Sequence, residues 1–178
     1  MPSPLPNGDA APRPPLPSAT SSPPLNLLIL PLRLITFGFS LAAAVSTATN
    51  HSPSWLRFHS FRFVFAANAI VAAYSVFEAC ASAYEIAKGG ATLFPEPMQL
   101  LFDFAHDQTF AYMAVAAAAA GAADARRLSA AGECSGFCVR ADVSVALGFG
   151  AFFFLALASL VSGFRLARYV TGGSRRHT

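Results

Sequence analysis

The sequence predicts an all-α integral membrane protein: a four-helix bundle that follows a disordered N-terminal tail. Of the 178 residues, 54% are hydrophobic and only 12% are charged, and the mean hydropathy is +0.50. A soluble domain usually has about 25% charged residues. Four stretches reach the roughly 20 apolar residues that a membrane-spanning helix needs. The connectors between them are short, which favours antiparallel neighbouring helices.

The N-terminal residues 1–24 combine proline, serine and small side chains, with few large apolar residues. Such a segment cannot offset the entropy lost on ordering, because it has too little apolar surface to bury. We therefore expect a disordered cytoplasmic tail. Docking onto a proline-recognising module is the alternative to a plain flexible tail.

The membrane domain is predicted over residues 25–168 and is followed by a basic tail, residues 169–178. The spans are expected at about residues 27–49, 62–86, 99–123 and 143–164. Few residues remain outside them, so we expect no soluble catalytic domain and no enzymatic activity.

The distribution of basic residues gives a weak signal for the orientation of the chain. The densest basic cluster beside a span follows the fourth one, at Arg165, Arg168, Arg175 and Arg176. Because positive charge favours the cytoplasmic side, both termini are predicted to be cytoplasmic. The net charge of +3 is small. It suggests contact with an anionic membrane leaflet and not with nucleic acid.

One arginine and three carboxylates lie within the predicted spans: Arg33, Glu78, Asp103 and Asp107. At about 1.5 Å per residue, Arg33 is roughly 9 Å from the start of its helix, and Glu78 and Asp107 are roughly 12 Å from the same side. Because unpaired charge is costly in lipid, we expect Arg33 to pair with Asp107 first and with Glu78 second. A proton relay through Asp103 and Asp107 is the alternative.

Polar residues of the second span share one helical face: Asn68, Ser75, Glu78, Ser82 and Glu85. At 100° per residue they fall within a stripe about 100° wide. We interpret this stripe as a face packed inside the bundle. The alternative is the wall of a hydrated path.

Small residues recur on the third and fourth spans, and Ala117, Gly121, Gly148 and Gly163 are the candidates for close helix packing. Small side chains let helix backbones approach closely in lipid. This pattern predicts lateral self-assembly through these two spans, although the same residues could serve packing within one chain.

Cys134 and Cys138 lie in the predicted second outer loop, where a disulfide is permitted. Their close spacing requires non-helical backbone, so a bridge and two free thiols both stay open. Cys80 lies in the second span and is expected to be a packing residue. The sequence contains no convincing metal-ligand spacing, and no cofactor is expected.

Several features in order resemble the plant Casparian strip membrane domain protein-like family. They are the first-span Arg33, the pair Asp107-Gln108 with Tyr112 and an alanine-rich stretch, and the segment FCVRADVSVALGFGAFFFLALASLVSG that leads into the fourth span. The resemblance covers about residues 27–168, and the four-span architecture is also distantly similar to MARVEL proteins.

The resemblance implies a multi-pass plasma-membrane protein with cytoplasmic termini. Such proteins associate with themselves and with related family members into a membrane scaffold that can organise cell-wall-modifying enzymes. Arg33 and Asp107 match the first-span arginine and third-span aspartate that characterise the family. The loop NHSPSWLRFHSF does not match the founding members, so a role in the Casparian strip itself is not implied.

Two further function classes fit the same sequence. A small ion or proton transporter or channel would use the intramembrane carboxylates as a relay. A membrane trafficking adaptor would use the proline-rich tail to capture a soluble partner.

Overall fold

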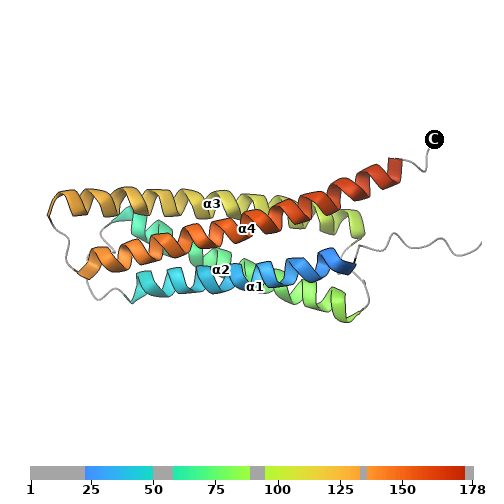
Figure 1. Cartoon of the computed structure of the whole chain (residues 1–178), viewed down its shortest axis with the longest axis horizontal. Helices are drawn as coiled ribbons and strands as arrows, with labels where there is room; N and C mark the ends of the chain where they lie inside the picture. The colour runs from blue at the N-terminus through green and yellow to red at the C-terminus, as the bar shows by residue number, and fades with distance from the viewer. Residues whose placement is uncertain (1–22, 50–57, 89–94, 133–135, 175–178) are drawn as a thin grey trace, which may run out of the picture.

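The computed structural model describes residues 23–49, 58–88, 95–132 and 136–174. These residues form four helices and contain no strand: α1 (Pro23–Ala48), α2 (His59–Ala87), α3 (Glu96–Ala130) and α4 (Gly136–Ser174). They form an elongated antiparallel bundle (Figure 1). The predicted all-α four-helix bundle is therefore confirmed. The predicted disordered tail lies mostly outside the described residues.

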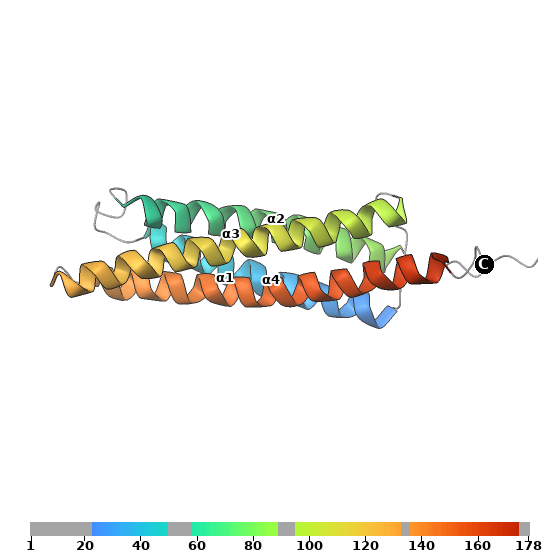
Figure 2. The same cartoon turned by 90° about the horizontal axis from the view of Figure 1, so that it is seen from above.

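The helices occupy the corners of a square in chain order. α1 packs against α2 and α4, while α3 packs against α4 and, less extensively, against α2. Two views at right angles show α3 and α1 at opposite corners (Figures 1 and 2). α1 begins and α4 ends at one end of the bundle, which we call the terminal end; the other is the distal end.

Two helix boundaries differ from the expected tails. α1 begins at Pro23, inside the predicted tail, because proline is well tolerated in the first turn, where its missing N–H is not needed. α4 continues to Ser174, so residues 169–174 of the predicted basic tail are helical. No proline interrupts this stretch.

α3 and α4 are the longest helices, with 35 and 39 residues. At 1.5 Å per residue they measure about 52 and 58 Å, which exceeds the roughly 30 Å of a bilayer core. Parts of both helices must therefore lie beyond the hydrocarbon if they cross the membrane.

Three helices of the described chain are long and apolar enough to span a membrane: α1, α2 and α4. α3 has sufficient length, but charged and polar residues in its first half and near its C-terminal end lower its hydropathy. Its crossing of the membrane, and hence the fourth span, stays a prediction.

The polar stripe of α2 faces the interior of the bundle. Asn68, Ser75, Glu78 and Glu85 are all buried, and Ser82 is half-buried. Large apolar side chains such as Phe77 and Leu160 are exposed on the outside. This inside-out distribution suits a bundle surrounded by lipid, where polar groups find partners only inside.

Candidate functional site: a buried ion-pair network

Arg33 and Asp107 form a bidentate ion pair across the diagonal of the bundle. The Arg33 Nη1 donates to Asp107 Oδ1 at 2.8 Å, and Nη2 donates to Oδ2 at 3.1 Å. Arg33 is 1% exposed and Asp107 is fully buried. The planar guanidinium matches both carboxylate oxygens, which makes this a strong and directional contact. Only a long side chain can connect α1 with α3, because these helices stand at opposite corners.

The remaining positions on the Asp107 carboxylate are filled from the other two helices. Tyr74 of α2 donates its hydroxyl to Oδ1 at 2.8 Å, and Ser162 of α4 donates to Oδ2 at 2.9 Å. Asp107 therefore accepts four hydrogen bonds, and all four helices contribute to its environment. Such saturation offsets part of the cost of burying a charge.

Glu78 provides a second carboxylate for Arg33. Its Oε2 lies 3.3 Å from Arg33 Nη2, and its residue is 3% exposed. Tyr74, one helical turn earlier, also lies beneath the guanidinium, with the Arg33 Cζ 5.6 Å from its ring centroid. The cation is thus enclosed by groups of α2 and α3, while Arg33 Nε has no hydrogen-bond partner in the described residues.

The comparisons with known proteins identify the family of this chain. A family model for the Casparian strip membrane protein domain matches residues 22–154. The chain belongs to the Casparian strip membrane protein family. It is 49% identical over 180 residues to CASP-like protein 4C1 of Ricinus communis, covering 98% of this chain and 92% of that protein.

Other plant relatives show similar identity to this family member. CASP-like protein 4C1 of Arabidopsis thaliana is 50% identical over 85% of this chain and 81% of its own length. CASP-like protein 4C2 of Populus trichocarpa is 50% identical over 84% of this chain and 83% of its own length. No solved structure gives a significant match. The resemblance inferred from the sequence is therefore confirmed at the level of the family.

A second polar cluster lies nearer the terminal end of this family member. Gln99 of α3 donates to Glu85 Oε1 at 2.9 Å, and Arg165 of α4 lies 3.8 Å from Glu85 Oε2. Glu85 and Gln99 are buried, and the Arg165 side chain is only 10% exposed. This cluster ties α2, α3 and α4 together without α1.

Asp103 is the predicted site residue that the structure leaves outside direct pairing. It is buried, one turn before Asp107 on α3. Among the described residues, no hydrogen bond or ion pair shown by the structure ends on its carboxylate. Four buried carboxylates therefore share two arginines in this half of the bundle.

Sequence reasoning missed two partners in the first network, Tyr74 and Ser162, and two in the second cluster, Gln99 and Arg165. Tyr74 could have been found, because it stands four residues before Glu78 and so shares its helical face. Ser162 carried no such signal, since small residues recur throughout α4. Gln99 and Arg165 lie at the ends of their spans, where polar residues are ordinary.

Three of the four candidate packing residues are buried in the bundle, and Gly163 is half-buried. A Cβ on Gly121 would be 2.7 Å from Val64 Cγ2, and one on Gly163 would be 2.9 Å from a ring carbon of Phe104. One on Gly148 would contact Ala118 and Asn68 at 3.5 Å. Ala117 is fully buried. These residues make contacts within one chain, which is the alternative that the sequence left open, and self-assembly through α3 and α4 stays a prediction.

The distal end is held by different chemistry. Phe61 and Phe137 make an edge-to-face contact with ring centroids 5.3 Å apart, beside Ala125 and Cys138. Thr47 and Ser144 hydroxyls lie 2.5 Å apart, and Ser144 also donates to the Ala43 carbonyl at 2.9 Å. A charged contact at this end is exposed: Arg140 of α4 donates to the Thr49 carbonyl at 3.0 Å.

The structure describes one of the two predicted bridge cysteines. Cys138 is buried in the distal cluster and is disulfide-bonded, whereas Cys134 lies outside the described residues. The pairing of Cys138 with Cys134 therefore stays a prediction. Over the described ranges, no group of His, Cys, Asp or Glu side chains is suited to a metal ion. Every oxygen of Asp107 already has protein donors, so this network is suited to joining helices.

Proposed function

We propose that this chain is a plasma-membrane scaffold that associates with itself and with related family members into an immobile membrane domain. The observation that carries the proposal is the convergence of all four helices on the Asp107 carboxylate. The buried charged and hydroxyl groups of this network bind one another, and these bonds hold the four helices together as one unit. Such a unit can be assembled laterally through its outer surface.

The family supports a membrane role, and the small residues already have contacts within one chain. Gly121, Gly148 and Gly163 each lie close to a side chain of another helix. We therefore place self-association on the exposed outer faces of the helices. Cell-wall-modifying enzymes are the proposed clients of the resulting platform, and no catalytic role is proposed for the chain itself.

Lateral mobility and crosslinking test the scaffold function. The full chain carrying a fluorescent label is expressed at native level in plant cells, and fluorescence recovery after photobleaching is measured. We expect slow recovery in patches, together with crosslinked oligomers, whereas a lipid-anchored label in the same membrane recovers fully. A freely diffusing monomer would contradict the proposal.

The proposed orientation places both chain termini in the cytoplasm. It is supported by the basic residues Arg165 and Arg168 at the end of α4. A cysteine introduced at Ser129, near the end of α3, should react with an impermeant reagent on intact cells. A cysteine at Ser174 should react only after permeabilisation. The reverse pattern would place the termini outside.

The excess of buried carboxylates favours a second candidate, a proton or cation transporter. Asp103 is buried near the two arginine-centred clusters and would be the first residue to exchange a proton. Purified protein in vesicles is tested for proton flux with a pH-sensitive dye. Flux that is lost in Asp103→Asn would favour transport, whereas a wild-type signal equal to that of empty vesicles would exclude it.

A further inference from the structure

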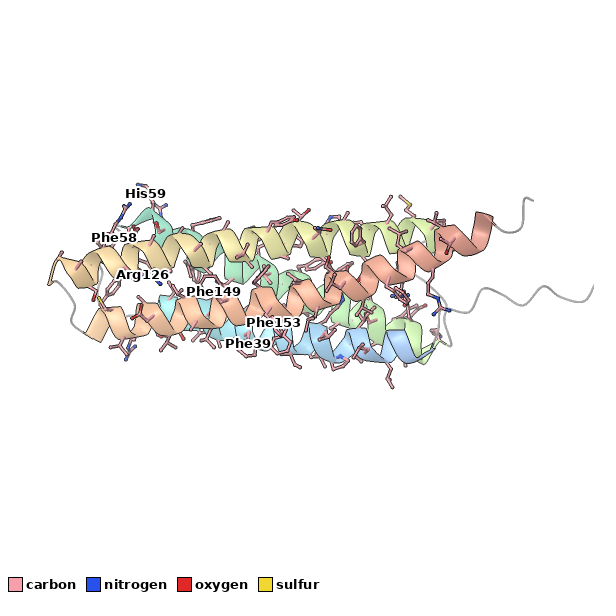
Figure 3. The ribbon with its side chains drawn as sticks, turned by 45° about the horizontal axis from the view of Figure 1, so that its top comes forward. Phe39, Phe58, His59, Arg126, Phe149 and Phe153 are labelled. Carbon is pink, nitrogen blue, oxygen red and sulfur yellow. The ribbon has the colours of Figure 1, made fainter. Side chains whose placement is uncertain are left out.

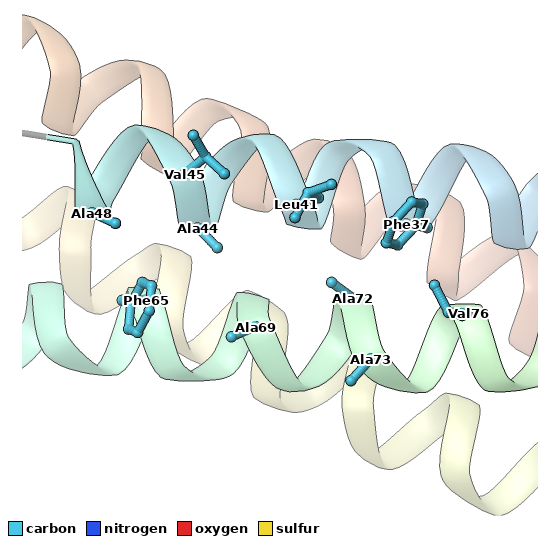
Figure 4. Close-up of a pocket in the computed structure, with 10 residues that line it drawn as sticks. All are labelled: Phe37, Leu41, Ala44, Val45, Ala48, Phe65, Ala69, Ala72, Ala73 and Val76. Atoms are coloured by element: carbon cyan, nitrogen blue, oxygen red, sulfur yellow. The ribbon is translucent and has the colours of Figure 1, made fainter.

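An apolar groove runs between α1 and α2 on the outside of the bundle. Its volume is about 610 Å³, and α1 and α2 line it with ten side chains, five of them alanines. Phe65 lies at the distal end of the groove, opposite Ala48, and Phe37 and Val76 lie at its other end (Figure 4). The alanines lie between these ends together with Leu41 and Val45, so both helices contribute small side chains to the groove.

The chemistry and length of the groove suit the hydrocarbon of one leaflet. None of the lining side chains carries a hydrogen-bonding group. The rise from Phe37 to Ala48 is eleven residue steps, which is about 16 Å along α1. Half of a bilayer core is about 15 Å. With the first span at residues 27–49, as the sequence predicts, the groove would extend from near the middle of the membrane to its distal surface.

A cation stands at the distal mouth of this groove. Arg62 precedes Ala69 by seven residues and Ala73 by eleven, so all three share one face of α2. Its side chain is exposed, and the described residues provide no ion pair for its guanidinium. An arginine at this depth is suited to binding a phosphate by two parallel hydrogen bonds.

We propose that the groove is a binding site for a phospholipid of the leaflet opposite the chain termini, with one acyl chain between α1 and α2 and the phosphate on Arg62. An apolar groove of this length with a cation at its distal end matches the acyl chain and the anionic phosphate of one phospholipid. A helix of a second copy would place no phosphate beside Arg62.

Native mass spectrometry of the full-length protein tests this site. The protein is released from vesicles of phosphatidylcholine and phosphatidylglycerol, and phospholipid adducts are counted per chain. We expect one retained phospholipid in the wild type. Ala73→Phe, which fills the groove from an exposed position, should abolish retention. Arg62→Gln should weaken it about fivefold, the contribution of one basic residue near a membrane surface.

Two control variants show whether adding a ring or removing a cation elsewhere on the bundle also changes lipid retention. Ala119→Phe adds the same ring at an exposed alanine of α3, and Arg126→Gln removes an exposed cation at the distal end of α3. Arg126 lies among the distal side chains in Figure 3. Both controls should retain the lipid as the wild type does.

Three outcomes would overturn the proposal. Equal retention in all variants would show that bound phospholipid is unspecific. Displacement by diacylglycerol as effective as by phospholipid would remove the role of the phosphate. Unchanged lipid retention in Ala73→Phe, together with lost crosslinking between chains, would assign the groove to a second copy. Helix content and melting temperature are measured for each variant, and Arg62→Gln tests the site without altering the groove.

Discussion

The two ends of the bundle solve the problem of helix association in lipid by different means. Toward the terminal end, Arg33, Glu78, Tyr74, Asp107 and Ser162 join four helices by charge-assisted hydrogen bonds. At the distal end, close-packed aromatic rings, glycines and neutral hydroxyls do so. The comparison teaches that polar interactions fix which helices meet, whereas small residues set how closely they approach.

The largest expected effect comes from removing the central cation. Arg33→Met leaves Asp107 and Glu78 buried without their guanidinium, so we expect the free energy of unfolding to fall by about 3–5 kcal/mol. It is measured by denaturant titration in mixed micelles. The variant Arg33→Met with Asp107→Leu should lose less than the sum of the two single losses, because it leaves fewer unpaired charges.

Arg127→Met is the matched control for this prediction. Arg127 is 83% exposed and lies 3.8 Å from Asp124, so its ion pair is screened by solvent. We expect its removal to cost less than about 1 kcal/mol. Strict additivity of the Arg33 and Asp107 substitutions would show that the two residues are not coupled.

A smaller effect is expected from filling the close contacts of the distal half. Gly121→Leu would push side-chain atoms into Val64 and Val145, whose nearest carbons lie 2.7 and 3.0 Å from the position of a Cβ. Overpacking of this kind costs about 1–3 kcal/mol in unfolding free energy. The same micelle titration measures it.

Gly38→Leu provides the comparison, because nothing lies within 4 Å of a Cβ at that exposed position of α1. The change should alter stability by less than about 0.5 kcal/mol. If Gly38→Leu destabilises as much as Gly121→Leu, the effect belongs to loss of glycine in any helix and not to packing.

The smallest expected losses of stability come from removing one hydroxyl in each half of α4. Ser162→Ala removes a donor to the Asp107 carboxylate, and Ser144→Ala removes a donor to the Ala43 carbonyl. Hydrogen bonds between membrane helices contribute about 0.6 kcal/mol on average and at most about 1.7 kcal/mol. We expect Ser162→Ala to be the more destabilising, because its acceptor is charged.

The same titration, run on both serine variants in parallel, measures this difference. Each serine has a second interaction, since Ser162 also bonds the Ala158 carbonyl and Ser144 lies beside Thr47. Equal losses, or a larger loss for Ser144→Ala, would show that charge does not distinguish the two halves of the bundle.

The sequence by itself determined the helices and the depth of their charges. Apolar length depends on composition, and depth follows from the rise per residue, so spacing along the chain is enough to place Arg33, Glu78 and Asp107 at one level. The buried face of α2 followed from helical periodicity alone. The ends of α1 and α4 were predicted less well, because membrane boundaries and helix boundaries obey different constraints.

Only the tertiary structure decided which groups meet at that level. Helical periodicity is a local property and does not specify which helix stands opposite another. The diagonal placement of α1 and α3 lets Arg33 cross the bundle, makes Tyr74 and Ser162 donors to Asp107, and leaves Asp103 outside direct pairing. It also turns Gly121 and Gly163 inward. These partners depend on contacts between residues far apart in the chain, which composition and spacing do not encode.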